Sequence, residues 1–221
     1  MTQTTYSRAS ALESRIQSTL TNTFIALGGM WAVTAVTSYL TLNVQMTLTM
    51  MLVLFGGSLL TLFATMAFRN SGFGLVLLAV FAGLEGASLG PLMNHYLHLH
   101  NGVQMVTTAA VLTMAATFGC ALFCVTTRKS FSQFGGFLFA GLIILLVASI
   151  AGIFFHSQTF DLVVSGAASL LFVGYMLYDI SAVVNGEETN YISAALGVYL
   201  DMLNLFLNLL RLLEIFNSSD D

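Results

Sequence analysis

Long apolar stretches, separated by short polar segments, make up almost the whole chain. Seven of them have about the 20 apolar residues that an α-helix needs to cross a bilayer. They cover approximately residues 22–42, 46–68, 73–93, 104–126, 135–155, 161–184 and 192–216. The pattern therefore predicts an all-α, polytopic membrane protein with seven transmembrane helices.

The sequence outside these stretches is too short for a soluble domain. Residues 1–21 are polar and rich in Ser and Thr, and no small-residue cleavage site follows the first apolar stretch. This favours a retained tail over a secretory signal. We therefore expect a tail over residues 1–21, a transmembrane domain over residues 22–216 and a short C-terminal tail over residues 217–221.

Composition narrows the classes of function. Of the 221 residues, 57% are hydrophobic and 7% are charged, whereas soluble domains carry about 25% charged residues. The net charge is −4 and the chain has no basic cluster, which argues against nucleic acid as a partner. The expected partner is the lipid bilayer. No nucleotide loop, serine triad or cofactor motif is present, so we expect that the protein is not an enzyme and holds no tightly bound cofactor. A monomer is the favoured oligomeric state.

The positive residues predict the orientation in the membrane. Arg8 and Arg15 precede the first span, Arg69 follows the second, and Arg128 and Lys129 follow the fourth. The loops after spans one, three and five contain no Lys or Arg. The positive-inside rule therefore places the N-terminus in the cytoplasm and, after seven crossings, the C-terminus outside.

Two aspartates lie inside the last two spans, where a charged side chain costs about 2.5–3.5 kcal/mol near the bilayer centre. Asp179 is about five residues, and Asp201 about nine residues, from the loop that joins these spans, so their depths are similar. We expect them to meet and to share one proton, because two carboxylates in a dry site repel each other. Tyr175 lies on the same face as Asp179. The alternative is that each aspartate only hydrogen-bonds a neighbouring helix.

The seventh span carries a polar stripe. Asp201, Asn204, Asn208 and Arg211 fall within one wedge of the helix at about 100° per residue. Lipid cannot satisfy such groups, so the stripe predicts a central helix whose polar face meets a partner helix or a wet cavity. We expect Arg211 to lie beside Glu214, three residues further on.

A third acid, Glu85, lies near the middle of the third span between Gly83 and Gly86. Gly90 completes a small-xxx-small spacing with Gly86, which predicts close approach of another helix. Two interpretations of Glu85 stay open: a neutral, hydrogen-bonded acid in that contact, or an oxygen ligand on a cation path. Pro91 is expected to end this span at its outer side.

Histidines and cysteines suggest weaker hypotheses. His95, His98 and His100 follow the third span and could bind a transition metal or titrate near neutrality, but a solvated polar loop is favoured. Cys120 and Cys124 are too few for a structural zinc site and poorly placed for a disulfide within one helix. We therefore interpret them as reduced packing residues.

Several short motifs together resemble one family. They are Tyr178-Asp179, Tyr199-Leu200-Asp201, Asn204-Leu205-Phe206, Leu209-Leu210-Arg211, and the loop Thr127-Arg128-Lys129-Ser130 leading into Phe134-Gly135. This set resembles the Bax inhibitor-1 family, also called the transmembrane BAX inhibitor motif family. The loop from Gly186 to Ile192 resembles its bacterial branch, which includes a membrane modulator of the FtsH protease.

The resemblance implies a bundle of six helices around a central seventh, in a bacterial inner membrane. It also implies that Asp179 and Asp201 are the family's paired aspartates, with Ca²⁺ as a tentative ligand and as the permeant ion. Arg69 lies where relatives carry basic residues that can pair with the sixth-helix aspartate in a closed state. Residues 46–68 lack the acid that some relatives carry in span two. In the outer part of a calcium path, Glu85 would have to take the place of that acid.

Three functions follow as hypotheses. The first is a pH-sensitive Ca²⁺ leak channel, in which loss of the shared proton separates spans six and seven. It is favoured because relatives on the protease-modulator branch can lack the aspartate at position 201. The second is a modulator of FtsH that acts by protein–protein interaction through the tail of residues 1–21. The third, an intramembrane aspartyl protease, is disfavoured because Val198 and Leu200 replace the glycines of the Gly-x-Gly-Asp motif.

Overall fold

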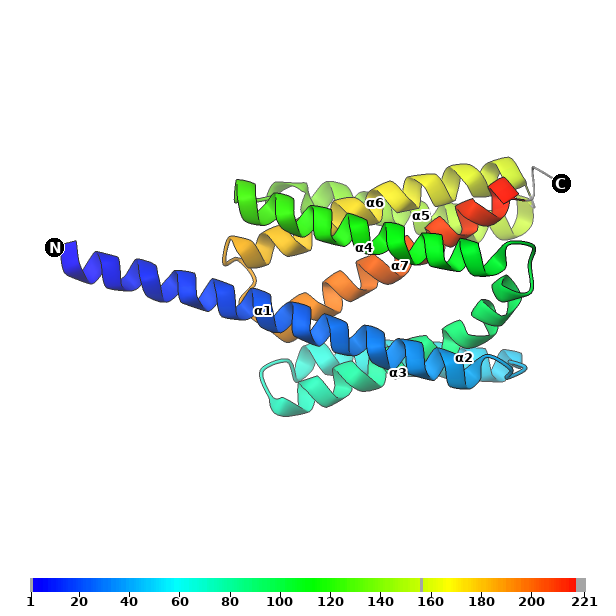
Figure 1. Ribbon diagram of the computed structural model, residues 1–221, viewed down its shortest axis with the longest axis horizontal. Coiled ribbons are helices and arrows are strands. Elements are labelled where there is room, and N and C mark those ends of the chain that lie inside the picture. Colours follow the sequence, from blue (N-terminus) through cyan, green and yellow to red (C-terminus); the bar gives the residue numbers. More distant parts are fainter. Residues whose placement is uncertain (1, 156, 218–221) are drawn as a thin grey trace. The chain divides into compact units, whose positions relative to one another are not determined.

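The computed structural model describes residues 2–155 and 157–217 (Figure 1). The last four residues of the predicted C-terminal tail, 218–221, lie outside this range. The elements are α1 (Thr2–Thr41), α2 (Leu48–Ala67), α3 (Gly72–Leu97), α4 (Gly102–Thr127), η1 (Ser132–Phe134), α5 (Gly135–Phe155), α6 (Gln158–Val184) and α7 (Tyr191–Asn217). All seven α-helices are long and apolar enough to cross a membrane, so the predicted all-α protein with seven transmembrane helices is confirmed.

The chain folds into two compact units. The first comprises Met1–His98 and Val183–Tyr199, and the second comprises Leu99–Ala182 and Leu200–Asp221. Helix α7 therefore contributes its first turns to one unit and the remainder to the other. In an 18-residue apolar segment of α7, 61% of the residues are buried, against at most 33% in any other span. This burial agrees with the prediction that the seventh span is central.

In the first unit, α3 packs directly against α1 through two glycines, and α2 lies along α3 (Figure 1). A Cβ atom on Gly86 would overlap the backbone of Thr34, and one on Gly90 would overlap Ser38 and Thr41. The predicted close approach of another helix at these glycines is therefore confirmed, and that helix is α1.

The prediction that Pro91 ends the third span is wrong, because α3 continues through it to Leu97. Proline lacks the N–H that would bond the carbonyl of Ala87 four residues earlier. The hydroxyl of Thr41 on α1 lies 3.2 Å from that carbonyl oxygen and donates to it. A neighbouring helix thus satisfies the backbone group that proline leaves free, as membrane helices require. As a result, His95 lies in the last turn of α3 rather than in a loop.

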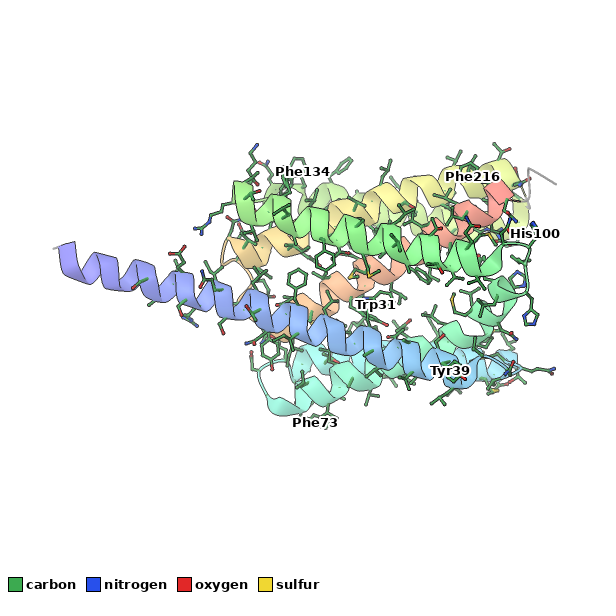
Figure 2. The ribbon with its side chains drawn as sticks, viewed as in Figure 1. Trp31, Tyr39, Phe73, His100, Phe134 and Phe216 are labelled. Carbon is green, nitrogen blue, oxygen red and sulfur yellow. The ribbon has the colours of Figure 1, made fainter. Side chains whose placement is uncertain are left out.

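Tyr199 joins the start of α7 to α1 and α3 in the core of the first unit. Its hydroxyl lies 2.7 Å from Oγ1 of Thr34, which itself lies 3.1 Å from the carbonyl oxygen of Ala82. The tyrosine ring packs against Trp31, labelled in Figure 2, and Phe81, with centroid distances of 5.4 and 5.9 Å. This buried hydrogen-bond chain fixes where α7 begins.

The loop before α7 is held by Asn190. Its Oδ1 accepts hydrogen bonds from the N–H groups of Ile192 and Ser193, both at 3.0 Å, which caps the helix. Its Nδ2 donates to the carbonyl oxygen of Arg69 at 2.9 Å and to Oδ1 of Asn70 at 2.8 Å. The turn between α2 and α3 and the start of α7 are therefore connected within the first unit.

Candidate functional site

Asp179 of α6 and Asp201 of α7 lie against each other in the second unit. A side-chain hydrogen bond joins their carboxyl groups. Asp201 is only 5% exposed, whereas Asp179 is half-buried. The two intramembrane acids thus meet directly, at the depth where the sequence predicted that their helices approach each other.

The contact between these carboxyl groups has a chemical consequence. An ionised carboxylate can only accept hydrogen bonds, so a hydrogen bond between two carboxyls requires a proton on one of them. Two carboxyls in such a contact can hold one proton between them, whereas ionising both would place two like charges side by side. The second oxygen of Asp201, Oδ2, is buried, and none of the described residues forms a hydrogen bond with it.

Tyr175 and Cys120 lie close to this pair. Tyr175 is within electrostatic range of both aspartates, as its predicted place on the face of Asp179 suggests. Cys120 of α4 is within electrostatic range of Asp201, a proximity that the sequence analysis missed. Cys124, one turn along α4, donates through its Sγ to the carbonyl oxygen of Leu177 on α6, at 3.7 Å. Both thiols are buried and free, as expected of reduced packing residues.

The two asparagines of the polar stripe bond to their own helix. Nδ2 of Asn204 donates to the carbonyl oxygen of Leu200, and Nδ2 of Asn208 donates to that of Asn204, each at 2.8 Å. Asn208 also lines a cavity of about 450 Å³ between α5, α6 and α7, together with Ser165 and Arg211. The stripe therefore does face a cavity at its C-terminal end, while its amide N–H groups are satisfied locally.

Arg211 lies at this cavity between two acids. Its Nη1 is 2.8 Å from Oε2 of Glu214, which confirms the predicted i,i+3 pair. Its Nη2 is 2.7 Å from Oδ2 of Asp161 in the first turn of α6, a partner that the sequence analysis missed. Two carboxylates around one guanidinium leave this end of the cavity with a net negative charge.

Glu85 lies on the side of α3 that faces α2. Its carboxyl forms a hydrogen bond with the side chain of Ser58 on α2, and both residues line a cavity of about 560 Å³. The glycine contact with α1 is on another side of the helix. Glu85 therefore has a hydrogen-bond partner on α2 rather than on α1 at the glycine contact, and its place on a cation path stays a prediction.

The remaining candidate residues, Arg69 and the three histidines, belong to other segments of the chain than the aspartate pair. Arg69 belongs to the turn between α2 and α3, so its pairing with Asp179 stays a prediction. His95 lies in α3, His98 follows that helix, and His100 lies in the turn before α4, beside the carboxyl end of α7 (Figure 2). All three histidines are exposed, and the described residues contain no cluster of three or more His, Cys, Asp or Glu suited to a metal ion. This favours the solvated polar segment over a histidine metal site.

Seven helices able to span a membrane, with two carboxyls in contact on the last two, define an integral membrane protein with an intramembrane acid site. The family described as Bax1-I, inhibitor of apoptosis-promoting Bax1, matches residues 16–218. The chain therefore belongs to the Bax inhibitor family, and the resemblance inferred from its motifs is confirmed.

Three relatives illustrate the range of this family. The chain is 38% identical over 218 residues to a Vibrio cholerae protein named "Uncharacterized membrane protein", covering 97% of this chain and 98% of that protein. It is 34% identical over 152 residues to the Escherichia coli K12 protein "Modulator of FtsH protease YccA", covering 69% of each. It is 34% identical over 163 residues to mouse "Protein lifeguard 4", covering 73% of this chain and 66% of that protein.

Proposed function

We propose that this protein is a pH-sensitive cation leak channel, with Ca²⁺ as the permeant ion and Asp179 and Asp201 as the gate. The observation that supports the proposal is the hydrogen bond between these carboxyls, one of which is buried. While the pair holds its proton, α6 and α7 are clamped together. Loss of the proton leaves two anions that repel each other and whose oxygens attract a hard cation.

The cavity of about 450 Å³ suits the outer part of such a path. Ser165 and Asn208 line it from α6 and α7, the same helices that carry the aspartates. The salt bridges of Arg211 with Asp161 and Glu214 neutralise its charge, so the mouth of the cavity does not repel cations. Oxygen-rich, acidic surroundings are those that Ca²⁺ prefers.

Calcium flux into reconstituted vesicles tests the proposal. Flux through the wild-type protein should rise with the pH on the side of the aspartate pair, which the predicted topology makes the cytoplasmic side. In Asp179→Asn and Asp201→Asn, separately and together, the rise with pH should disappear. Ser169→Ala is the control on α6, because its hydroxyl donates to the carbonyl oxygen of Ser165 within that helix, and it should keep the rise with pH. A double variant whose flux still follows pH would overturn the mechanism.

A second candidate function is modulation of the membrane protease FtsH. It rests on the 34% identity to the Escherichia coli protein named as a modulator of that protease, and a further relative named "Inner membrane protein YccA" supports a location in the bacterial inner membrane. The N-terminal tail is the segment that we expect FtsH to contact. Thr19 donates to the carbonyl oxygen of Thr189 at 3.5 Å and Ile16 lies against Gly186, so only the residues before them can be removed without disturbing the first unit.

Deleting residues 2–12 separates the two functions. The truncated protein should keep its pH-dependent calcium flux and lose control of FtsH, measured as the turnover of an FtsH substrate in cells. The Asp179→Asn, Asp201→Asn double variant should do the opposite. Unchanged protease control in the truncated protein would exclude the tail as the contact.

A further inference from the structure

Glu85 is a third intramembrane acid, one that the proposed gate does not use. A carboxylate in a transmembrane helix costs free energy, and such residues usually have a functional role or an interaction partner. Its hydrogen bond with Ser58 satisfies part of the carboxyl. The rest of its surroundings is a cavity of about 560 Å³ between α2 and α3, within the roughly 300–1,000 Å³ of sites that hold small organic molecules.

The walls of this cavity are mainly apolar. Met46, Met51, Leu54, Phe55 and Leu92 supply hydrophobic surface. Such a lining, with a few convergent polar groups, is the usual composition of an organic-ligand site. Methionine and phenylalanine also adapt well to ligands of irregular shape.

The charged groups that line the cavity determine whether it favours a positive or a negative ligand. Glu85 is the only acid in the lining, which contains no Lys or Arg, and His95 is the only other titratable group. The side-chain oxygens come from Glu85, Ser58 and Ser88 alone, far fewer than the six to eight that Ca²⁺ takes. One carboxylate at an apolar wall instead matches a single positive charge carried on an apolar body.

The cavity opens toward lipid. Met51, Phe55 and Leu92 are exposed although they lie on helices that span the membrane, and exposed apolar side chains on such helices contact acyl chains. A hydrophobic cation that partitions into the bilayer can therefore reach Glu85 from the side, without passing the aspartate pair.

We propose that the cavity between α2 and α3 binds a monovalent organic cation with an apolar body, which enters from the lipid and uses Glu85 as its counter-ion. This site lies wholly in the first unit, goes beyond the calcium pathway and does not depend on it. A lipid with an ammonium headgroup and a diffusible lipophilic cation share the required chemistry.

Binding of radiolabelled tetraphenylphosphonium to the full-length protein in micelles of an uncharged maltoside detergent tests the proposal, because no ammonium lipid is then present until one is added. We expect saturable binding, weakened at least about tenfold in Glu85→Gln, because the variant keeps the shape and removes the charge. Leu54→Trp should abolish binding by filling the cavity while the carboxylate remains.

Two controls keep the test decisive. Glu214→Gln removes an acid from α7 and should bind the probe as the wild type does, and so should Asp179→Asn. Addition of phosphatidylethanolamine distinguishes the sources: competition assigns the site to a lipid headgroup, and its absence to a diffusible cation. Absence of saturable binding to the wild type, or equal affinity in a folded Glu85→Gln variant, would overturn the proposal.

Discussion

The two units place carboxyl groups in the membrane in different ways. In the second unit, Asp179 and Asp201 are each other's hydrogen-bond partners. In the first unit, Glu85 is bonded to the hydroxyl of Ser58 beside an open, largely apolar cavity. A hydroxyl can donate to an ionised carboxylate, but a second carboxyl can do so only with a bound proton.

The partner therefore determines what an intramembrane acid can do. In the proposed mechanism, the aspartate pair holds a proton while it remains in contact, and its pH sensitivity follows from that proton. Glu85 can keep its hydrogen bond when ionised and then offers a negative charge to a ligand. Variants in each unit test this difference between a proton-holding pair and a counter-ion.

The largest expected effect is in the packing of the helix that carries Glu85. Gly86→Ala should lower the free energy of unfolding by about 3 kcal/mol or more, because the new Cβ overlaps the backbone of α1, which cannot move as a flexible side chain can. Gly83→Ala on the same helix is the matched control, since its Cβ would make ordinary contacts at 3.7 and 3.8 Å. Equal stability of the two variants would contradict the packing described for α1 and α3.

The next effect distinguishes the two kinds of acid by the pH dependence of stability. The folded pair holds one proton, whereas exposed carboxyls in the unfolded chain are ionised above about pH 5. The unfolded state thus binds one proton fewer, and stability should fall as pH rises, by up to about 1.4 kcal/mol per pH unit until the folded pair loses its proton.

Unfolding in mixed detergent micelles at a series of pH values measures this slope. The Asp179→Asn, Asp201→Asn double variant should show a clearly smaller slope, and Glu85→Gln should retain the part that belongs to the pair. A slope that vanishes in Glu85→Gln instead would reverse the roles assigned to the two regions.

The smallest effect concerns Pro91, which lines the cavity of Glu85. Thr41→Val should lower the free energy of unfolding by about 1 kcal/mol, because it leaves the carbonyl of Ala87 without a donor. In a Pro91→Ala background the loss should shrink, since the restored N–H can bond that carbonyl. Thr126→Val, which removes an exposed hydroxyl bonded within α4, should be nearly neutral. If Thr41→Val lowers the free energy of unfolding equally in both backgrounds, Thr41 does not compensate for the missing N–H of Pro91.

The sequence was sufficient for the features that depend on local pattern. Apolar length predicted the seven spans, helical periodicity predicted the pair of Arg211 with Glu214, and the short loop between two spans suggested that Asp179 and Asp201 meet. The interpretation of Pro91 failed because its missing N–H is compensated by Thr41, fifty residues earlier in the chain, which no local rule takes into account.

Other features depended on packing between distant segments. Asp161 was missed as a partner of Arg211, although span six begins and span seven ends on the same predicted side of the membrane. The bond of Glu85 with Ser58 depends on how α2 lies along α3. Asn204 and Asn208 have the polar face that periodicity predicted, but the choice of their own carbonyls as partners is decided by rotamers.

Infrared spectroscopy of protonated carboxyl groups across pH tests most directly whether the aspartates hold one proton between them. In a Glu85→Gln background, which removes the third intramembrane acid, a protonated-carboxyl band should be present just above about pH 5, where exposed carboxyls are already ionised. It should titrate away over the pH interval in which calcium flux rises, and it should be missing when Asp179 and Asp201 are both replaced by Asn. A band that persists unchanged in that variant, or that is absent at every pH while the pair is intact, would contradict the account.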